Sequence, residues 1–216
     1  MIGLDIKRIG EMSTVLCIGA HCDDIEIGCG GTLIRWVREY PRAHFVWTVF
    51  AREPVRDAET RAAAEQLLSG ARSVDLRWYD FRPGYFPSQH ESIKDTFESL
   101  KQELRPDVIL THRREDRHQD HALLADLTWN TFRSHLILEY EIAKYEGDLG
   151  HPNLFVPLSK HDVERKIAVL IDSFPSQRHR SWFTADTFRG LARLRGIESA
   201  APEGFAEAFH ARKLQV

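Results

Sequence analysis

The stretch VLCIGAHCDDIEIGCGGTL, residues 15–33, decides the fold of this 216-residue chain. Its apolar start predicts a buried strand over residues 14–18, and its glycines lead into a helix expected over residues 32–40. Between the two lie His21 and, two residues on, a pair of adjacent aspartates. In an open α/β sheet, ligands bind beyond the carboxyl ends of the strands. An imidazole and two carboxylates at that place therefore predict a site for a divalent metal.

The alternation of strand and helix continues along the chain. Further strands are expected over residues 43–50, 73–79, 106–111 and 136–140. Further helices are expected over residues 57–68, 91–104 and 121–134. Repeated βα units of this kind indicate an α/β fold, with a Rossmann-like, mostly parallel sheet flanked by helices.

The last third of the sequence is less regular than the rest. Helices are expected over residues 163–174 and 182–194. Residues 204–210 are either a late strand or a docked tail. The length predicts a single domain over residues 1–216, with a Rossmann-like core at about 13–140 and an irregular C-terminal extension at about 141–216.

Composition narrows the class of protein. The net charge of -3 gives no electrostatic case for binding nucleic acid, and no apolar run approaches the roughly 20 residues needed to cross a bilayer. Residues 1–11 lack the apolar core of a signal peptide. Cys17, Cys22 and Cys29 are odd in number and too close together for a disulfide framework. The sequence therefore predicts a cytoplasmic protein, and it leaves a homo-oligomer open.

A second polar cluster follows the strand expected over residues 106–111. The sequence DRHQDH, residues 116–121, supplies two histidines and two aspartates. Loops that follow parallel strands leave the same edge of the sheet, so this cluster is expected to meet the one around His21. Histidines mixed with carboxylates suit zinc or a similar first-row ion that has three protein ligands and an open position for water.

Together, the motifs A-H-C-D-D-x-x-x-G-x-G-G-T-L, P-D-V-x-x-T and D-R-H-x-D-H resemble those of the PIG-L/LmbE family of metal-dependent N-deacetylases. Arg56 and Glu59 resemble the family's R-x-x-E helix, and Ser176 and Gln177 resemble its S-Q element. The likeness runs from about residue 15 to residue 177. Two separated motifs with matching internal spacing are more specific than either motif alone.

The resemblance implies roles for five residues. His21, Asp24 and His121 would bind the metal. Asp23 would be the general base, and His118 the electrophilic or general-acid histidine. A metal held by three protein groups acidifies its bound water, and a neighbouring aspartate can accept the proton. The implied cofactor is Zn²⁺, with Fe²⁺ as an alternative, and the implied reaction is hydrolysis of the N-acetyl group of a small amino sugar or sugar conjugate.

Several neighbouring residues carry further expectations. Asp120 is expected to orient a histidine ring nitrogen. Arg56 either contacts a polar substrate or forms an ion pair at a helix N-terminus. Cys22 and Gln119 stand where the family has prolines, so the rigidity that proline gives both loops is lost. Residues 112–117 are expected to be mostly a solvated loop, in which Asp116 holds the loop or a histidine.

Two other functions remain open from the sequence. The same site could hydrolyse a different acyl amide, or the chain could be a non-catalytic Rossmann-type module that binds a nucleotide. The glycines at 28, 30 and 31 do not match the G-x-G-x-x-G fingerprint, and the carboxylates before them would repel a pyrophosphate. Close packing of the backbone is the expected reason for these glycines.

Overall fold

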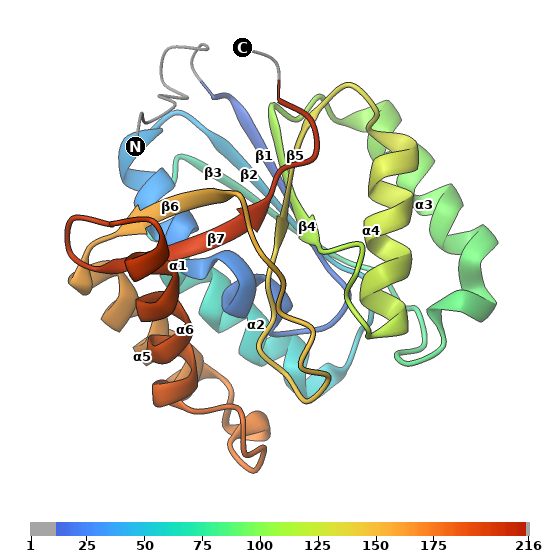
Figure 1. The fold of residues 1–216 in the computed structure, drawn as a ribbon. Helices are drawn as coiled ribbons and strands as arrows, with labels where there is room; N and C mark the ends of the chain where they lie inside the picture. The colour runs from blue at the N-terminus through green and yellow to red at the C-terminus, as the bar shows by residue number, and fades with distance from the viewer. Residues whose placement is uncertain (1–11, 215–216) are drawn as a thin grey trace.

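A computed structural model describes residues 12–214, and within them a seven-stranded sheet carries helices on both faces (Figure 1). The strand order is β3-β2-β1-β4-β5-β7-β6. The strands are β1 (Thr14–Gly19), β2 (His44–Val49), β3 (Ser73–Trp78), β4 (Val108–His112), β5 (Leu136–Tyr140), β6 (Leu154–Leu158) and β7 (Phe205–His210). The first five strands in spatial order are parallel, and β7 runs antiparallel to β5 and β6. The expected α/β fold with a mostly parallel sheet is confirmed.

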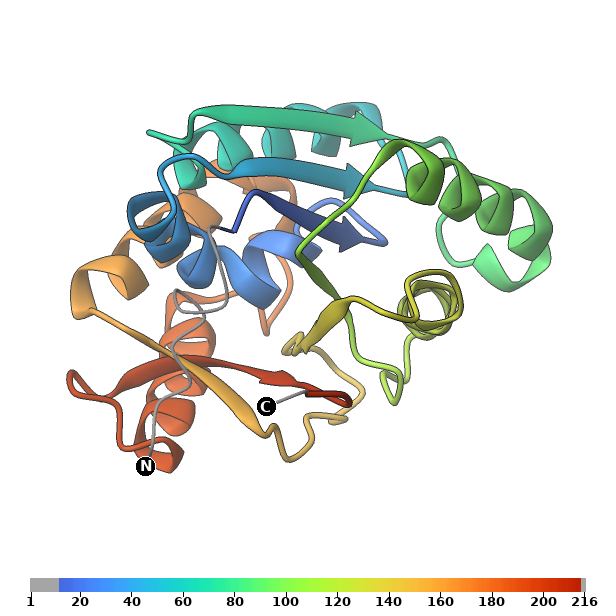
Figure 2. The same ribbon diagram turned by 90° about the horizontal axis from the view of Figure 1, so that it is seen from above.

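Two groups of helices cover the two faces of the sheet (Figure 2). One face carries α1 (Asp24–Glu39), α2 (Pro54–Leu67), α5 (Lys160–Ser173) and α6 (Ala185–Glu198). The other carries the 3-10 helix η2 (Phe86–Gln89), α3 (His90–Glu103) and α4 (Gln119–Thr131). Side chains of β1 alternate between the two cores, with Cys17 in the core under α1 and Ile18 in the core under α4. Because both faces are buried, β1 is apolar from Val15 to Ile18, as expected of a central parallel strand.

Helix α1 begins at Asp24, so the prediction of a helix that starts only at residue 32 was wrong. The helix is broken at Cys29, whose φ of -145° lies outside the helical region. The carboxylate of Glu207 on β7 accepts the N–H groups of Gly31 and Thr32 at 2.9 and 2.6 Å. These bonds cap the second half of the helix as an N-terminal capping side chain would. The glycine-rich turn expected from the sequence is therefore a capped break inside one helix.

Two glycines of α1 are required by close packing, as the sequence suggested. A Cβ on Gly28 would lie 2.3 Å from Cδ2 of Tyr140, and a Cβ on Gly31 would lie 2.5 Å from Cδ1 of Leu158. A Cβ on Gly28 would overlap the ring of the buried Tyr140, and a Cβ on Gly31 would displace the end of the Leu158 side chain. The first half of α1, which carries the polar cluster, can therefore lie directly against β5.

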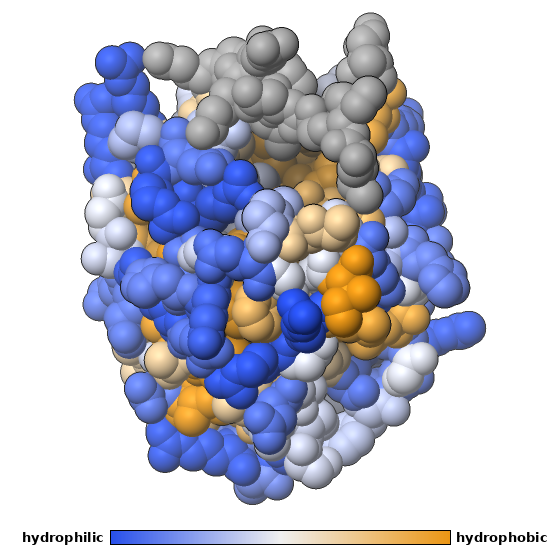
Figure 3. All heavy atoms as spheres, turned by 60° about the vertical axis from the view of Figure 1, so that its left-hand side comes forward, coloured by the Kyte–Doolittle hydropathy of each residue, from blue (hydrophilic) through white to orange (hydrophobic). Residues whose placement is uncertain are grey.

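The C-terminal extension is more regular than its sequence indicated. Residues 205–210 form a strand rather than a docked tail, and β6 was not predicted at all. Two hydrophobic side chains of α6, Leu194 and Ile197, are exposed. Figure 3 shows the described part of the face that includes α6, on which hydrophobic side chains are scattered among hydrophilic ones rather than joined in one broad patch.

The sequence also carried expectations about a signal peptide and a membrane-spanning segment. Residues 1–11, on which the expectation of no signal peptide rested, lie outside the described residues. Among residues 12–214, no helix has both the length and the apolar character needed to span a membrane.

Candidate metal site

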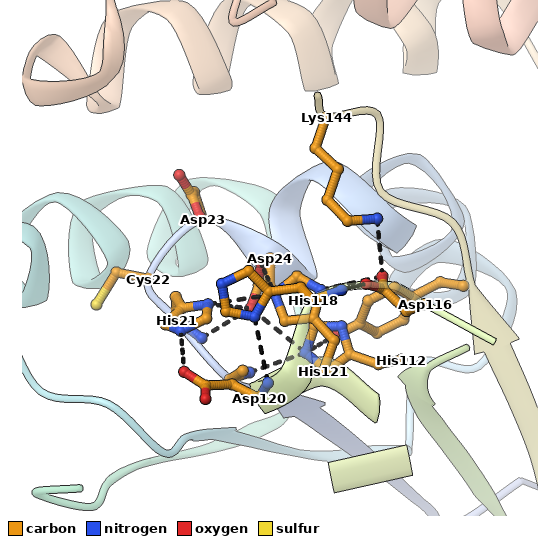
Figure 4. A network of polar contacts seen from close by, with 12 residues as sticks. His21, Cys22, Asp23, Asp24, His112, Asp116, His118, Asp120, His121 and Lys144 are labelled. Carbon is orange, nitrogen blue, oxygen red and sulfur yellow. Dashed lines mark hydrogen bonds and ion pairs between the residues drawn. The ribbon is translucent and has the colours of Figure 1, made fainter. Parts of the chain in front are cut away.

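Two turns at the carboxyl edge of the sheet bring the polar residues together (Figure 4). The β1–α1 turn carries His21 and Asp23 and leads into Asp24 at the start of α1, and the β4–α4 loop ends in His118, with His121 in the first turn of α4. Strands β1 and β4 are neighbours, with Cys17 paired to Leu110, so the two turns emerge side by side. The expectation that the two clusters meet is confirmed.

The side chains of His21, Asp24 and His121 converge on one point. Nδ1 of His21 lies 3.2 Å from Nε2 of His121 and 3.5 Å from Oδ2 of Asp24. Nε2 of His121 lies 3.5 Å from Oδ1 of Asp24. Ligands placed 2.0–2.1 Å from a tetrahedral zinc ion are about 3.3 Å apart, which is close to the spacing of the two nitrogens and of each nitrogen from one of the two Asp24 oxygens. Two nitrogens and a carboxylate oxygen are also the donor types that zinc and similar ions take.

Each converging imidazole is anchored by a carboxylate on its other nitrogen. Nε2 of His21 lies 3.0 Å from Oδ2 of Asp120, and Nδ1 of His121 lies 3.0 Å from Oδ2 of Asp116. Asp120 is itself held by the backbone N–H groups of Gly84 and Phe86 at 2.6 and 3.1 Å. Carboxylates in these positions fix the ring orientation and leave the opposite nitrogen directed at the converging point.

The surroundings move the pKa values of the two histidines in opposite directions. Burial by itself would lower the pKa of His21, but the hydrogen bonds to Asp120 and Asp24 outweigh it and raise the pKa to about 9. Burial and the nearby charge of His112 lower the pKa of His121 to about 4. For Asp24, burial opposes ionisation, but the surrounding histidines lower its pKa well below the usual range.

Asp23 has a different environment from Asp24, although the two are adjacent. It precedes the first turn of α1 with φ at 101°, a left-handed conformation that few non-glycine residues adopt. Its carboxylate points away from the histidines (Figure 4) and lies 3.1 Å from the guanidinium of Arg56. Burial raises the pKa of Asp23, and the positive charge of Arg56 opposes that rise without cancelling it.

His118 lies at the mouth of the site, half-buried. Its ring stacks on His121 with the centroids 4.4 Å apart and meets His21 edge-on at 4.9 Å. Nδ1 of His118 accepts the backbone N–H of Asp120 at 3.3 Å, which leaves Nε2 to carry the proton of the neutral ring. Burial and the charge of His21 lower the pKa of His118, so the neutral donor form is favoured.

His112 is a site residue that the sequence interpretation missed. It was expected in a solvated loop, but it ends β4, is fully buried and stacks on His121 with ring centroids 3.9 Å apart. Its Nε2 accepts the backbone N–H of Ala20 at 2.9 Å and lies 3.3 Å from the carboxylate of Asp24. The two-residue period of a strand places His112 on the same face as Leu110, toward α1, and that period was the available signal.

Metal-capable side chains at this edge of the sheet form two overlapping groups. One consists of His21, His118 and His121; the other consists of Asp24, His112 and His121. His121 belongs to both groups. Nε2 of His112 already accepts the N–H of Ala20, whereas no backbone N–H donates to Nδ1 of His21 or Nε2 of His121 among the bonds of the described residues.

The sequence elements outside the two turns also gather near the site. Arg56 donates to the carbonyl of Cys22 and pairs with Glu53 at 3.0 Å as well as with Asp23. The carboxylate of Glu59 accepts both the N–H and the hydroxyl of Ser176, at 3.0 and 2.5 Å. The R-x-x-E helix and the S-Q element are therefore in direct contact.

Cys22 does not face the converging histidines. Its sulfur points away from them (Figure 4) and lies 3.7 Å from Oδ1 of Asp57. Burial raises the pKa of the thiol to about 12, so Cys22 stays neutral at ordinary pH. The residue at the family's proline position is a packed thiol rather than a metal ligand.

The fold, the two motifs and the converging donors define a class of protein. Residues 16–132 match the family described as PIG-L, GlcNAc-PI de-N-acetylase. The match covers more than half of the chain, and the chain belongs to this family.

Three solved structures illustrate how widely the fold is shared. The N,N'-diacetylchitobiose deacetylase of Pyrococcus horikoshii is 20% identical with a TM-score of 0.68, over 93% of this chain and 84% of that one. The zinc-inhibited form of teicoplanin deacetylase Orf2 is 14% identical with a TM-score of 0.69, over 92% and 97%. The 4-carboxy-2-hydroxymuconate hydratase GalB of Pseudomonas putida KT2440 is 17% identical with a TM-score of 0.70, over 95% and 98%. At these identities the likeness shows the fold alone.

Proposed function

We propose that this protein is a divalent-metal-dependent de-N-acetylase that hydrolyses the N-acetyl group of an amino sugar or sugar conjugate. The observation that carries the proposal is the convergence of His21 Nδ1, His121 Nε2 and the Asp24 carboxylate in a chain of the PIG-L family. Their side chains are only 12%, 4% and 5% exposed, so a bound ion would be largely shielded from bulk water.

We assign the metal to His21, Asp24 and His121, with Zn²⁺ as the expected ion and Fe²⁺ as an alternative. Such an ion supplies a water of lowered pKa and polarises the carbonyl of the amide. The protein's own contribution is to present two imidazole nitrogens and one carboxylate with little freedom to move. Asp120 and Asp116 provide that restraint through the opposite ring nitrogens.

Asp23 is assigned as the general base. Its carboxylate lies one residue from the proposed ligand Asp24 and is not one of the converging donors, so it is the adjacent carboxylate that remains to accept the proton of the attacking water. Burial raises its pKa toward neutrality, which makes it a better base than an ordinary aspartate. The proton taken up can then pass to the departing amine nitrogen, which must be protonated before the bond to the acetyl carbon breaks.

His118 is assigned as the electrophilic histidine. Attack on the amide carbonyl places negative charge on its oxygen, and a donor fixed beforehand at that position lowers the barrier. Because Nδ1 of His118 accepts the N–H of Asp120, its Nε2–H is the available donor. This geometry favours a neutral N–H donor over the protonated ring.

Arg56 is assigned a substrate contact in addition to its ion pair with Asp23. Its guanidinium holds the carboxylate of Asp23 at 3.1 Å, and five N–H donors leave it able to meet a substrate hydroxyl as well. The two sequence interpretations of Arg56, substrate contact and helix-terminal ion pair, are therefore compatible in one residue.

The test is metal content paired with amine release. The purified protein should hold one zinc or iron per chain and should release amine from N-acetylglucosamine conjugates. Dipicolinate should stop the release, and added Zn²⁺ should restore it. A protein that binds no divalent ion would contradict the proposal, because the converging donors would then have another purpose.

The same purified protein can be used to test the two alternative functions. A panel of acylated amines distinguishes an amino-sugar deacetylase from an enzyme for another acyl amide, because the substrate that is hydrolysed is the one from which amine is released. Tight binding of NAD in the presence of chelator would instead support a nucleotide-binding module. The buried carboxylates of the β1–α1 turn argue against that module, because they stand where a pyrophosphate would lie.

A further inference from the structure

We propose that Lys144 is a positioning residue for the metal site. It holds the carboxylate of Asp116, which in turn fixes the ring direction of His121. This inference rests on the proposed function, because a fixed His121 matters for the affinity of a bound metal.

Lys144 lies in the connection between β5 and β6, outside both sequence motifs. Its side chain is only 8% exposed, whereas lysine is almost never buried without charged partners. Nζ lies 3.1 Å from Oδ2 of Asp116 and 2.6 and 2.7 Å from the two carboxylate oxygens of Asp148. Figure 4 shows the side chain reaching from this connection to Asp116 beside the histidines.

Asp116 is the point at which the lysine and the histidine meet. Its Oδ2 accepts from Nδ1 of His121 at 3.0 Å and from Lys144 at 3.1 Å. Its Oδ1 accepts the backbone N–H of His118 at 2.8 Å. The carboxylate is therefore held from two sides, and the position of the oxygen facing His121 depends on Lys144.

The His121 ring can move only by rotation about its Cα–Cβ and Cβ–Cγ bonds, and rotation about Cβ–Cγ changes the plane of the ring. That plane is set by stacking between His112 at 3.9 Å and His118 at 4.4 Å, measured between ring centroids. Stacking still allows small rotations about Cα–Cβ that slide the ring between its neighbours, and the hydrogen bond to Asp116 limits them. A displaced Asp116 would therefore turn Nε2 of His121 away from His21 Nδ1.

Asp148 keeps Lys144 in place. Its Oδ2 accepts the backbone N–H of Arg117 at 2.7 Å, and its carbonyl accepts the guanidinium of Arg113 at 2.6 Å. The β5–β6 connection is thus tied to the β4–α4 loop on both sides of Asp116. The β5–β6 connection, which lies outside the Rossmann-like core, thus supports the proposed metal ligand His121 within that core.

The test compares metal affinity in matched lysine variants. Lys144→Met should weaken Zn²⁺ binding about tenfold, at the low end of the loss typical for outer partners of metal ligands. Lys144→Arg should recover most of the affinity, and Lys101→Met, on the exposed surface of α3, should have no effect. Affinity is measured by chelator competition, and the visible absorption of the Co²⁺ form should change with Lys144→Met alone. Melting of the metal-free proteins checks folding, and Lys144→Gln replaces Lys144→Met if the latter does not fold.

A double variant tests whether Lys144 acts through Asp116. In an Asp116→Asn background, Lys144→Met should cause no further loss of Zn²⁺ affinity. An equal tenfold loss in both backgrounds, or unchanged affinity and Co²⁺ spectrum in Lys144→Met, would overturn the inference while leaving the proposed function intact. A wild-type protein that binds no metal would overturn both.

Discussion

The two turns that build the site hold their histidines in different ways. His21, in the β1–α1 turn, takes its anchoring carboxylate from the opposite turn, through Asp120, and its pKa is raised to about 9. His121, in the first turn of α4, takes its anchor from the preceding β4–α4 loop, through Asp116, and its pKa is lowered to about 4. A metal arriving at this site would therefore find one ligand already a free base and another still carrying a proton.

The backbones of the two turns differ as well. The β1–α1 turn passes through Asp23 with φ at 101°, a conformation that costs free energy and survives only where the surroundings impose it. The β4–α4 loop ends in an ordinary extended residue, His118, before a regular helix. The turn with the unusual backbone is the one that points two adjacent carboxylates in different directions.

Removal of a converging histidine is expected to have the largest effect. His21→Ala and His121→Ala should each abolish stoichiometric zinc binding and lower amine release by on the order of 10³-fold or more, since the metal supplies several kcal/mol of barrier lowering. The control is His161→Ala, because the side chain of His161 is 79% exposed. Metal analysis and amine release are measured on the same preparations, and full zinc occupancy in either ligand variant would contradict the assignment.

Asp23→Asn should separate chemistry from metal binding in the β1–α1 turn. The expected loss of turnover is on the order of 10²- to 10³-fold, the usual contribution of a general base, with zinc content unchanged. In the wild-type protein the rate should fall as the pH drops through the raised pKa of Asp23, because the protonated carboxyl cannot accept a proton. This acid limb should lie above the ordinary range of aspartate and should disappear from the residual activity of Asp23→Asn. Full activity in that variant would remove the general-base role.

The sequence predicted that the two motifs meet, but it did not predict the supporting residues His112 and Lys144. The meeting of the two motifs follows from the parallel order of β1 and β4, which the alternation of apolar runs already indicated. His112 was missed because a single residue extended β4 beyond its apolar run. Lys144 was missed because it lies in an irregular connection whose path depends on tertiary contacts with Asp116 and Asp148.

The fold shows the same division between local and distant causes. The strands of the parallel half were predicted closely, since each is a buried apolar run. The start of α1 was not predicted, because the local sequence indicates a turn at the glycines. Glu207, about 175 residues further on, caps the break there within the helix. No window of sequence around the glycines contains that carboxylate.

The proton carried by His21 can be counted directly. At pH 7.5 free His21 should be protonated, because its pKa is raised to about 9, and ligation through Nδ1 requires that proton to leave. Zinc binding should therefore release about one proton from His21, and affinity should fall about tenfold per pH unit below that pKa. Titration calorimetry in buffers of different ionisation enthalpy measures the number.

Matched carboxylate variants test whether the proton released on zinc binding comes from His21. Asp120→Asn should reduce the number of protons released, because its carboxylate is a main cause of the raised pKa of His21. Asp116→Asn should leave the number unchanged, because His121 already binds no proton at pH 7.5. An equal response to both substitutions would mean that the two turns do not differ in this respect.

The smallest effect is expected at Gln119, where the family has proline. Gln119 is the first helical residue of α4, a position whose N–H has no partner within the helix and which therefore accepts proline. The preceding residue, His118, has φ at -75° and ψ at 120°, which is compatible with a following proline. Gln119→Pro should therefore raise the free energy of unfolding by about 0.4–1 kcal/mol, because proline lowers the conformational entropy of the unfolded chain. Loss of the hydrogen bond from the Gln119 side chain to the carbonyl of Gly84 should offset part of this gain. Urea unfolding should show a change within about 1 kcal/mol, with zinc affinity retained. A larger destabilisation would mean that the backbone of the β4–α4 loop at Gln119 cannot accept proline.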